Sequence, residues 1–150
     1  MKAVIQRVSR ASVTVDGKVT GAIGRGYLVL LGVAKGDTEQ DLTALAAKIQ
    51  TIRLFEEPPG KMNLSIGDVG GAVLVVPQFT LLARCTKGTR PSFDGAEAPA
   101  RASEFCDRFV AELRGKGLIV ETGVFGADMK VELLNDGPVT ILLDTRESRT

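Results

Sequence analysis

Three short segments contain the residue types from which a catalytic or binding site could be built. The first is Gln78-Phe79-Thr80, which follows Pro77 inside the apolar run 72–82. Because proline cannot donate a hydrogen bond to a neighbouring strand, its position predicts an edge strand or a bulge. A bulge leaves backbone N–H groups unpaired, and such groups beside a hydroxyl can stabilise an oxyanion. An edge strand whose polar side chains face water fits the same pattern.

The second segment runs from Asn135 to Thr140, between two apolar stretches, and contains a Gly137-Pro138 bond. A surface turn is the simplest interpretation of this composition. The alternative depends on the peptide bond, because an X-Pro bond loses only about 0.5–1 kcal/mol on becoming cis. A cis bond can turn the carbonyls of both residues the same way, which makes a rigid pair of backbone acceptors.

The third segment is a basic stretch that begins at Arg84 and also contains Lys87 and Arg90. Together with the glycine and hydroxyl groups around them, these cations could hold phosphates. A solvated loop fits the stretch equally well, and the run is too short to establish nucleic-acid binding.

The composition excludes several kinds of chemistry. The 150 residues include no histidine, which removes Ser-His-Asp and Cys-His nucleophile pairs and the usual zinc and iron ligand sets. We therefore expect no metal. The glycines form neither a P-loop nor a dinucleotide-binding motif, so we also expect no nucleotide cofactor. Lys and Arg number 19 and Asp and Glu number 18, and a net charge of +1 means that any polyanion must be bound by a local patch.

The cysteines and the hydropathy indicate the compartment. Cys85 and Cys106 are too few and too far apart for a disulfide framework, which fits a reducing environment. The first residues turn polar too early for a signal peptide, and no apolar stretch approaches the roughly 18 residues of a membrane span. We therefore expect a soluble cytoplasmic protein without a membrane partner.

The elements that must position these segments follow from hydrophobic periodicity. One helix is predicted to begin at an Asp37 N-cap, with Gln40 completing a capping box, and a second to run from Pro99 to Gly115. This order favours one α/β domain over residues 1–145, a mixed sheet with two helices packed on it, and a frayed tail over 146–150. The predicted strands are 3–8, 11–15, 18–23, 27–33, 72–82, 118–124, 129–134 and 139–143.

The same segments resemble those of one family. On these motifs, and along the chain from Met1 to about Asp144, the sequence resembles the D-aminoacyl-tRNA deacylases, also called D-tyrosyl-tRNA deacylases. One departure is Pro77, which stands where the family usually has serine. The matching stretches are Ile5-Gln6-Arg7-Val8, Ala11-Ser12-Val13, Gly60-Lys61-Met62-Asn63-Leu64, Gln78-Phe79-Thr80-Leu81, Arg90-Pro91-Ser92-Phe93, Gly126-Ala127-Asp128-Met129 and Asn135 to Thr140.

The resemblance implies a fold, an assembly and a site. The fold would be a barrel-like core with two helices packed on it, in a homodimer with two active sites at the subunit interface. Gly137 and Pro138 of one subunit, joined by a cis bond and braced by Arg7, would enter the site of the other subunit. Gln78-Phe79-Thr80 would be catalytic, and Met129 would also contact the substrate.

The activity that the resemblance implies is hydrolysis of the ester between a D-amino acid and the 3′ adenosine of a tRNA. Backbone N–H groups near Phe79 and Thr80 would stabilise the oxyanion, and water, the ribose hydroxyl or Thr80 would attack. Such a pocket would also accept glycyl-tRNA, because glycine has no side chain to exclude. The competing hypothesis is a dimeric module that binds an RNA end or a small ligand through Arg84, Lys87 and Arg90 without turnover.

Overall fold

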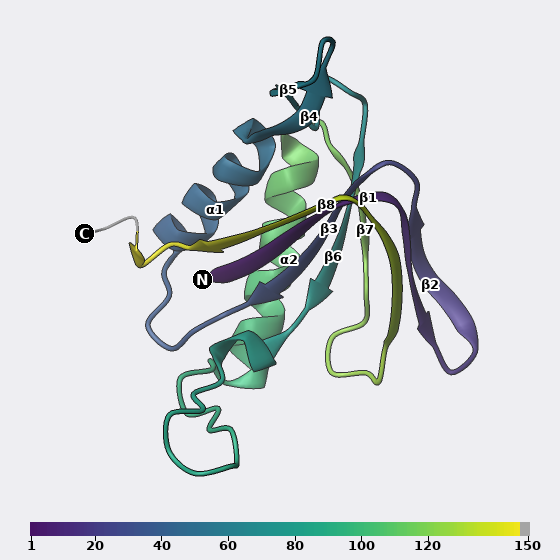
Figure 1. Cartoon of the computed structure of the whole chain (residues 1–150). Helices are drawn as coiled ribbons and strands as arrows, with labels where there is room; N and C mark the ends of the chain where they lie inside the picture. The colour runs from purple at the N-terminus through teal and green to yellow at the C-terminus, as the bar shows by residue number, and fades with distance from the viewer. Residues whose placement is uncertain (148–150) are drawn as a thin grey trace.

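The first strand organises the main sheet (Figure 1). In the computed structural model, which describes residues 1–147, β1 (Lys2–Val15) pairs along one edge with β8 (Lys130–Asp144). Its other edge pairs first with β3 (Gly26–Gly32) and then, beyond Arg10, with β2 (Lys18–Ile23). All three pairings are antiparallel, so one long strand joins three others.

Two parallel strands extend this sheet and nearly close it. β6 (Ala72–Pro77) pairs with β3, and β7 (Ile119–Thr122) pairs with β6. The free sides of β2 and β7 then approach each other closely, since a Cβ added to Gly21 would lie 2.6 Å from the carbonyl oxygen of Thr122. The predicted mixed α/β fold with a barrel-like core is therefore confirmed. A small hairpin of β4 (Arg53–Glu57) and β5 (Lys61–Ser65) lies apart from it.

Two helices cover one face of the sheet (Figure 1). α1 (Glu39–Thr51) and α2 (Pro99–Gly115) lie side by side and share one hydrophobic core with β1, β3 and β6. The apolar faces predicted from helical spacing are buried as expected, and α2 begins at the predicted proline and ends at the predicted glycine. The buried side chains are Leu42, Leu45, Ala46 and Ile49 of α1 and Ala102, Phe105, Cys106, Phe109, Val110 and Leu113 of α2.

The start of α1 differs from the prediction. The N-cap is Thr38 rather than Asp37, and Asp41 rather than Gln40 completes the capping box by accepting the Thr38 N–H at 2.8 Å. Asp37 is instead buried, where its carboxylate accepts the Ala34 N–H at 2.7 Å and pairs with the Met1 ammonium at 2.9 Å. The Met1 ammonium is far from Asp37 in the sequence, so the residues around the helix start do not reveal this pairing.

The end of β8 is tethered to the same region. We expected a tail from residue 146, but the Arg146 guanidinium donates to the carbonyl oxygen of Lys35 and lies 3.4 Å from the Asp37 carboxylate. Residues 148–150, the rest of the expected tail, lie outside the described residues. Within residues 1–147, the structure contains no helix with the length and apolar character that crossing a bilayer requires.

The buried carboxyl of Asp41 should make stability depend on pH. Burial alone would raise the pKa of this group, but hydrogen bonds from the Thr38 N–H and the Thr145 hydroxyl outweigh it and lower the pKa to about 2. Because the folded pKa lies below the ordinary value of 3.8, this stabilisation is present above about pH 4 and lost as the pH falls toward 2. Urea unfolding of Asp41→Asn at pH 7 should show a loss of about 2 kcal/mol.

The same variant should lose part of the acid dependence of stability. Between pH 4 and 2 its free energy of unfolding should fall less steeply than that of the wild type, because the titrating group is absent. Glu104→Gln, at an exposed position of α2, is the matched control and should follow the wild-type curve. Parallel acid profiles for wild type and Asp41→Asn would show that Asp41 contributes no such stabilisation.

Candidate active site

An apolar pocket of about 360 Å³ lies between the ends of two strands and α2. Part of its lining comes from β3 and from the buried face of α2, and part from residues that follow β6 and β7. The lining residues are Leu31, Val33, Pro77, Gln78, Phe79, Glu97, Pro99, Ala102, Cys106, Phe125 and Gly126. Two of the three predicted catalytic residues therefore line the pocket, and the third follows them directly in the chain.

We had predicted that Pro77 lies in an edge strand or a bulge. The structure shows neither. β6 is an interior strand between β3 and β7, and Pro77 is its last residue, opposite Leu31 of β3. The chain then leaves the sheet through a 3₁₀ turn, η1 (Phe79–Leu82). Because proline ends the strand by lacking an N–H, the ladder needs no bulge, and the Gln78 N–H makes its last bond to the carbonyl of Leu31 at 2.8 Å.

Backbone donors are nevertheless available beside the pocket. Phe79 and Thr80 are the first two residues of η1, and the first N–H groups of a helical turn have no acceptor in a preceding turn. The Phe79 ring is 58% exposed and packs edge-on against Phe93 at 5.1 Å between centroids. The Gln78 side-chain amide donates to the Thr80 hydroxyl oxygen, so both side chains are fixed relative to the turn.

The segment Asn135–Thr140 is a bulge within β8 rather than a surface turn between two strands. The two neighbours of Arg7 in β1 pair with Asn135 and Thr140, so residues 136–139 lie opposite Arg7 alone. The Asn135 side chain closes the bulge, because it donates to the Thr140 hydroxyl and accepts the Val139 N–H, both at 3.1 Å. The Gly137-Pro138 bond within it is cis, and both residues are exposed.

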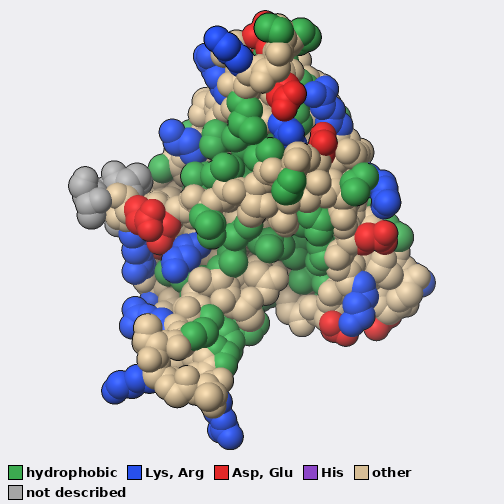
Figure 2. Space-filling view, viewed as in Figure 1, with side chains coloured by type: hydrophobic (Ala, Val, Ile, Leu, Met, Phe, Trp, Pro, Cys, Tyr) green, Lys and Arg blue, Asp and Glu red, His purple; other side chains and the backbone are tan. Residues whose placement is uncertain are grey.

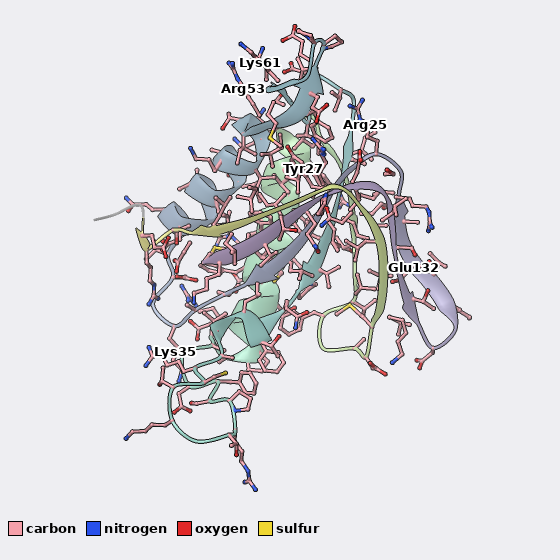
Figure 3. The ribbon with its side chains drawn as sticks, viewed as in Figure 1. Arg25, Tyr27, Lys35, Arg53, Lys61 and Glu132 are labelled. Atoms are coloured by element: carbon pink, nitrogen blue, oxygen red, sulfur yellow. The ribbon has the colours of Figure 1, made fainter. Side chains whose placement is uncertain are left out.

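Arg7 holds this bulge from the interior. Its side chain is buried, and the guanidinium donates to the carbonyl oxygen of Asp136 at 3.0 Å and to that of Leu54 at 2.6 Å. Tyr27, which faces Arg7 across the ladder and is labelled in Figure 3, stacks on Phe55 at 5.2 Å. Burial raises the pKa of Tyr27, and the nearby charge of Arg7 lowers it by a smaller amount. The phenol of Tyr27 therefore stays neutral.

The bulge and the pocket lie far apart within one chain. Leu31, which lines the pocket, pairs with Ala3, whereas the bulge lies opposite Arg7, four residues farther along β1. At about 3.3 Å per residue, these positions are separated by roughly 13 Å along the strand. Neither Gly137 nor Pro138 lines the pocket, so one chain does not bring the two predicted parts of the site together.

The remaining predicted residues lie at two other places. Met129 is half-buried beside the loop that follows β7, where its sulfur accepts the Val124 N–H at 3.4 Å, next to the pocket rather than in its lining. Arg84, Lys87 and Arg90 are exposed on a loop that projects from the body of the molecule (Figure 1). Paired backbone hydrogen bonds of 2.8 Å between Arg84 and Ser92 close the base of this loop.

The pocket includes ionisable groups that sequence reasoning did not single out. The Glu97 carboxylate accepts the Ala98 N–H at 2.8 Å and pairs with Arg101 at 2.6 Å, and these contacts lower its pKa, the backbone bond most. Burial raises the pKa of the Cys106 thiol to about 12, with a smaller effect of Asp107, which favours the protonated thiol over the thiolate. Among residues 1–147, no three His, Cys, Asp or Glu side chains gather to hold a metal ion.

Comparisons with known proteins show the family to which the chain belongs. Residues 4–144 match the model of the family described as D-Tyr-tRNA(Tyr) deacylase. A D-aminoacyl-tRNA deacylase of Anaeromyxobacter dehalogenans is 62% identical over 97% of this chain and 98% of that protein. A protein of the same name from Koribacter versatilis is 60% identical over 98% of this chain and 99% of that protein.

Two solved structures share the fold. One, titled c-Myc DNA Unwinding Element Binding Protein, has a TM-score of 0.89 and 45% identity, covering 96% of this chain and 98% of its own. The other, titled as a structural analysis of a probable eukaryotic D-amino acid tRNA deacylase, has a TM-score of 0.78 at 19% identity, covering 95% and 97%. At that identity the second likeness supports the fold alone.

Fold, pocket and relatives together define an enzyme of the hydrolase class. The chain belongs to the D-Tyr-tRNA(Tyr) deacylase family, and its close relatives are D-aminoacyl-tRNA deacylases.

Proposed function

We propose that this enzyme hydrolyses the ester between a D-amino acid and the 3′-terminal adenosine of a tRNA, and that it acts in the cytoplasm as a chiral proofreading enzyme of translation. The observation that carries the proposal is the pair of N–H groups of Phe79 and Thr80, which begin the turn beside an apolar pocket. An aminoacyl ester is already activated, so fixed backbone donors can suffice in a chain that has no histidine.

In the proposed reaction, a water oxygen bonds to the ester carbonyl carbon and the bond to the 3′ oxygen breaks. The departing 3′ oxygen takes a proton from the attacking water, and the carbonyl oxygen carries negative charge in between. The Phe79 and Thr80 N–H groups stabilise that charge, and removing one such donor typically costs about 2.7–4 kcal/mol. Thr80 is disfavoured as nucleophile because its hydroxyl is hydrogen-bonded to the Gln78 amide, which is not a base.

The chirality of the substrate is proposed to be sorted by a second copy of the chain. Gly137 and Pro138 are exposed and firmly held, yet they lie roughly 13 Å along the strand from the pocket of their own chain. In a homodimer they enter the pocket of the other copy, where their carbonyls bind the substrate amine beside Met129. This arrangement leaves no room for an L side chain, admits a D side chain and cannot exclude glycine.

The projecting loop is proposed to contact the tRNA. Arg84, Lys87 and Arg90 have no ion pair among the described residues, and they lie on the loop whose base is packed against the pocket through Phe93 and Phe79. Cations that are free to bind phosphates attract nucleic acid in a salt-dependent manner. The competing hypothesis, a module that binds an RNA end without turnover, uses the same loop and is separated by the assay that follows.

Hydrolysis of D-, L- and glycyl-tRNA substrates tests the proposal. Without added metal or nucleotide, the purified protein should turn over D-aminoacyl-tRNA and glycyl-tRNA many times. The kcat/KM for the D-ester should exceed that for the L-ester by about 100-fold or more, which corresponds to roughly 2.7 kcal/mol in the transition state. Equal rates for the two enantiomers would refute the account of chirality, and stoichiometric binding without turnover would favour the binding module.

A further inference from the structure

A second pocket lies at the end of η1 and is lined mainly by polar groups. It measures about 200 Å³, and its wall includes Leu82, the last residue of η1. Three cations line it, Lys2 from the start of β1, Arg84 from the base of the projecting loop and Arg146 from the end of β8. Figure 2 shows Lys and Arg side chains gathered on this side of the molecule, next to the projecting loop.

The charges of this pocket do not balance. The lining side chains carry three positive charges and one negative charge, that of Asp144, and the ammonium of Met1, which also lines the pocket, is paired with the buried Asp37 carboxylate. The Asp144 carboxylate already accepts the Arg146 N–H at 2.9 Å. The side chains of Lys2 and Arg84 have no hydrogen bond or ion pair with any residue between 1 and 147, although Lys2 stands opposite Asp144 where β1 pairs with β8.

Arg146 is the positioned cation of the three. Its guanidinium donates to the backbone carbonyl of Lys35, which Figure 3 shows near the top of the projecting loop, and lies 3.4 Å from the Asp37 carboxylate. A guanidinium held in this way keeps further N–H donors and presents them in a fixed fork, which is the geometry that binds phosphate oxygens.

We propose that this pocket binds a backbone phosphodiester of the single-stranded 3′ end of the tRNA, through Lys2, Arg84 and Arg146. The inference rests on the proposed function, because it places the strand that leads to the ester. Phe79 lines the first pocket and Leu82 the second, three residues apart in a 3₁₀ turn, which corresponds to about 6 Å. About two nucleotides of a strand, at about 3.4 Å of axis each, span that distance.

The location of the pocket also explains how the loop would assist. Arg84 lies at the closed base of the loop, whereas Lys87 and Arg90 lie farther out. A strand whose last nucleoside enters the first pocket would meet the second pocket next and the loop cations after it. The pocket would therefore fix the position of the 3′ end, while the outer cations add affinity that depends little on geometry.

The test removes the two unpaired cations in Lys2→Gln/Arg84→Gln and compares two substrates. One is D-aminoacyl-tRNA, and the other is the D-aminoacyl ester of adenosine, which has no phosphate. The ratio of the two kcat/KM values, tRNA over adenosine ester, should fall at least tenfold in the variant. The slope of log kcat/KM for the tRNA against log salt should also decrease in magnitude by up to about 0.7, since the pocket neutralises one phosphate of a single strand.

The matched control is Lys18→Gln/Lys48→Gln, which removes the same charge from exposed positions on β2 and α1. An equal fall of the ratio in this control, or an unchanged ratio in Lys2→Gln/Arg84→Gln, would overturn the proposal. Binding of uncharged tRNA decides the matter even without turnover, because the variant should bind more weakly than both the wild type and the control. If no D-aminoacyl ester is cleaved by the wild type, the proposed function fails while this binding comparison still tests the pocket.

Discussion

Replacing Gly137 with alanine should lower kcat/KM for D-aminoacyl-tRNA about 100-fold while leaving a folded protein. Gly137 has φ +134°, a backbone conformation that L side chains rarely adopt. An added Cβ would also lie 2.8 Å from a methyl carbon of Val139 and 3.1 Å from the guanidinium of Arg7. The backbone must therefore shift, at a cost of about 1–3 kcal/mol in stability, and a displacement of about 1 Å at a reacting site can cost 10²-fold in rate.

The control for this experiment is a glycine without such a constraint. Gly115 ends α2, has no atom near the position of an added Cβ, and is not in the left-handed region. Gly115→Ala should therefore have wild-type kinetics and wild-type or slightly greater stability. A Gly137→Ala enzyme with normal kcat/KM and intact D-selectivity would show that the bulge carbonyls take no part in substrate binding.

The elements dominated by local signals could be predicted from the sequence. α2 begins at Pro99 because a proline tolerates the first turn, and it stops after Gly115 because Gly117, two residues later, adopts the left-handed conformation with φ +87°. The hairpin at Asp16-Gly17 likewise depends on two residues with positive φ. In each case the residues that decide the structure lie within a few positions of one another.

The features that the sequence did not predict depend on distant partners. Asp37 has the composition of an N-cap, but the ammonium of Met1 and the guanidinium of Arg146 recruit its carboxylate instead. Asn135–Thr140 has the composition of a turn, but β1 continues beneath it and converts it into a bulge closed by side chains. Pro77 ends an interior strand because β7, over 40 residues later in the chain, covers that edge of β6.

Some residues of the candidate site could be singled out from local sequence, and others could not. Gln78, Phe79 and the Gly137-Pro138 bond could be singled out because unusual residue types mark them. The pocket itself could not be predicted, since Ala102 and Cys106 belong to the buried face of a helix and differ from other core residues only through what lies opposite them. Glu97 is equally inconspicuous, and its proximity to the predicted helix start at Pro99 was the one available signal.

Arg7→Met should destabilise the protein and also reduce its D-selectivity. The buried guanidinium makes two hydrogen bonds, to Asp136 at 3.0 Å and to Leu54 at 2.6 Å, and methionine replaces neither. Loss of charged hydrogen bonds of this kind should lower the free energy of unfolding by about 2–4 kcal/mol. The bulge would then lose its interior tether, so kcat/KM for the D-ester should fall by at least about tenfold and the ratio of D- to L-hydrolysis should fall with it.

The fall in the D/L ratio distinguishes positioning from a purely structural role. A destabilised enzyme that is still folded loses active molecules, which lowers both rates equally and leaves their ratio unchanged. A bulge whose carbonyls are displaced admits L side chains, so the two rates converge. Arg10→Met makes the same substitution at another position of β1. The Arg10 side chain is 63% exposed and pairs with Glu132 at 3.5 Å, and exposed ion pairs of this kind contribute little to stability. That control should keep both stability and selectivity, whereas an Arg7→Met enzyme that keeps its D/L ratio would assign Arg7 to stability alone.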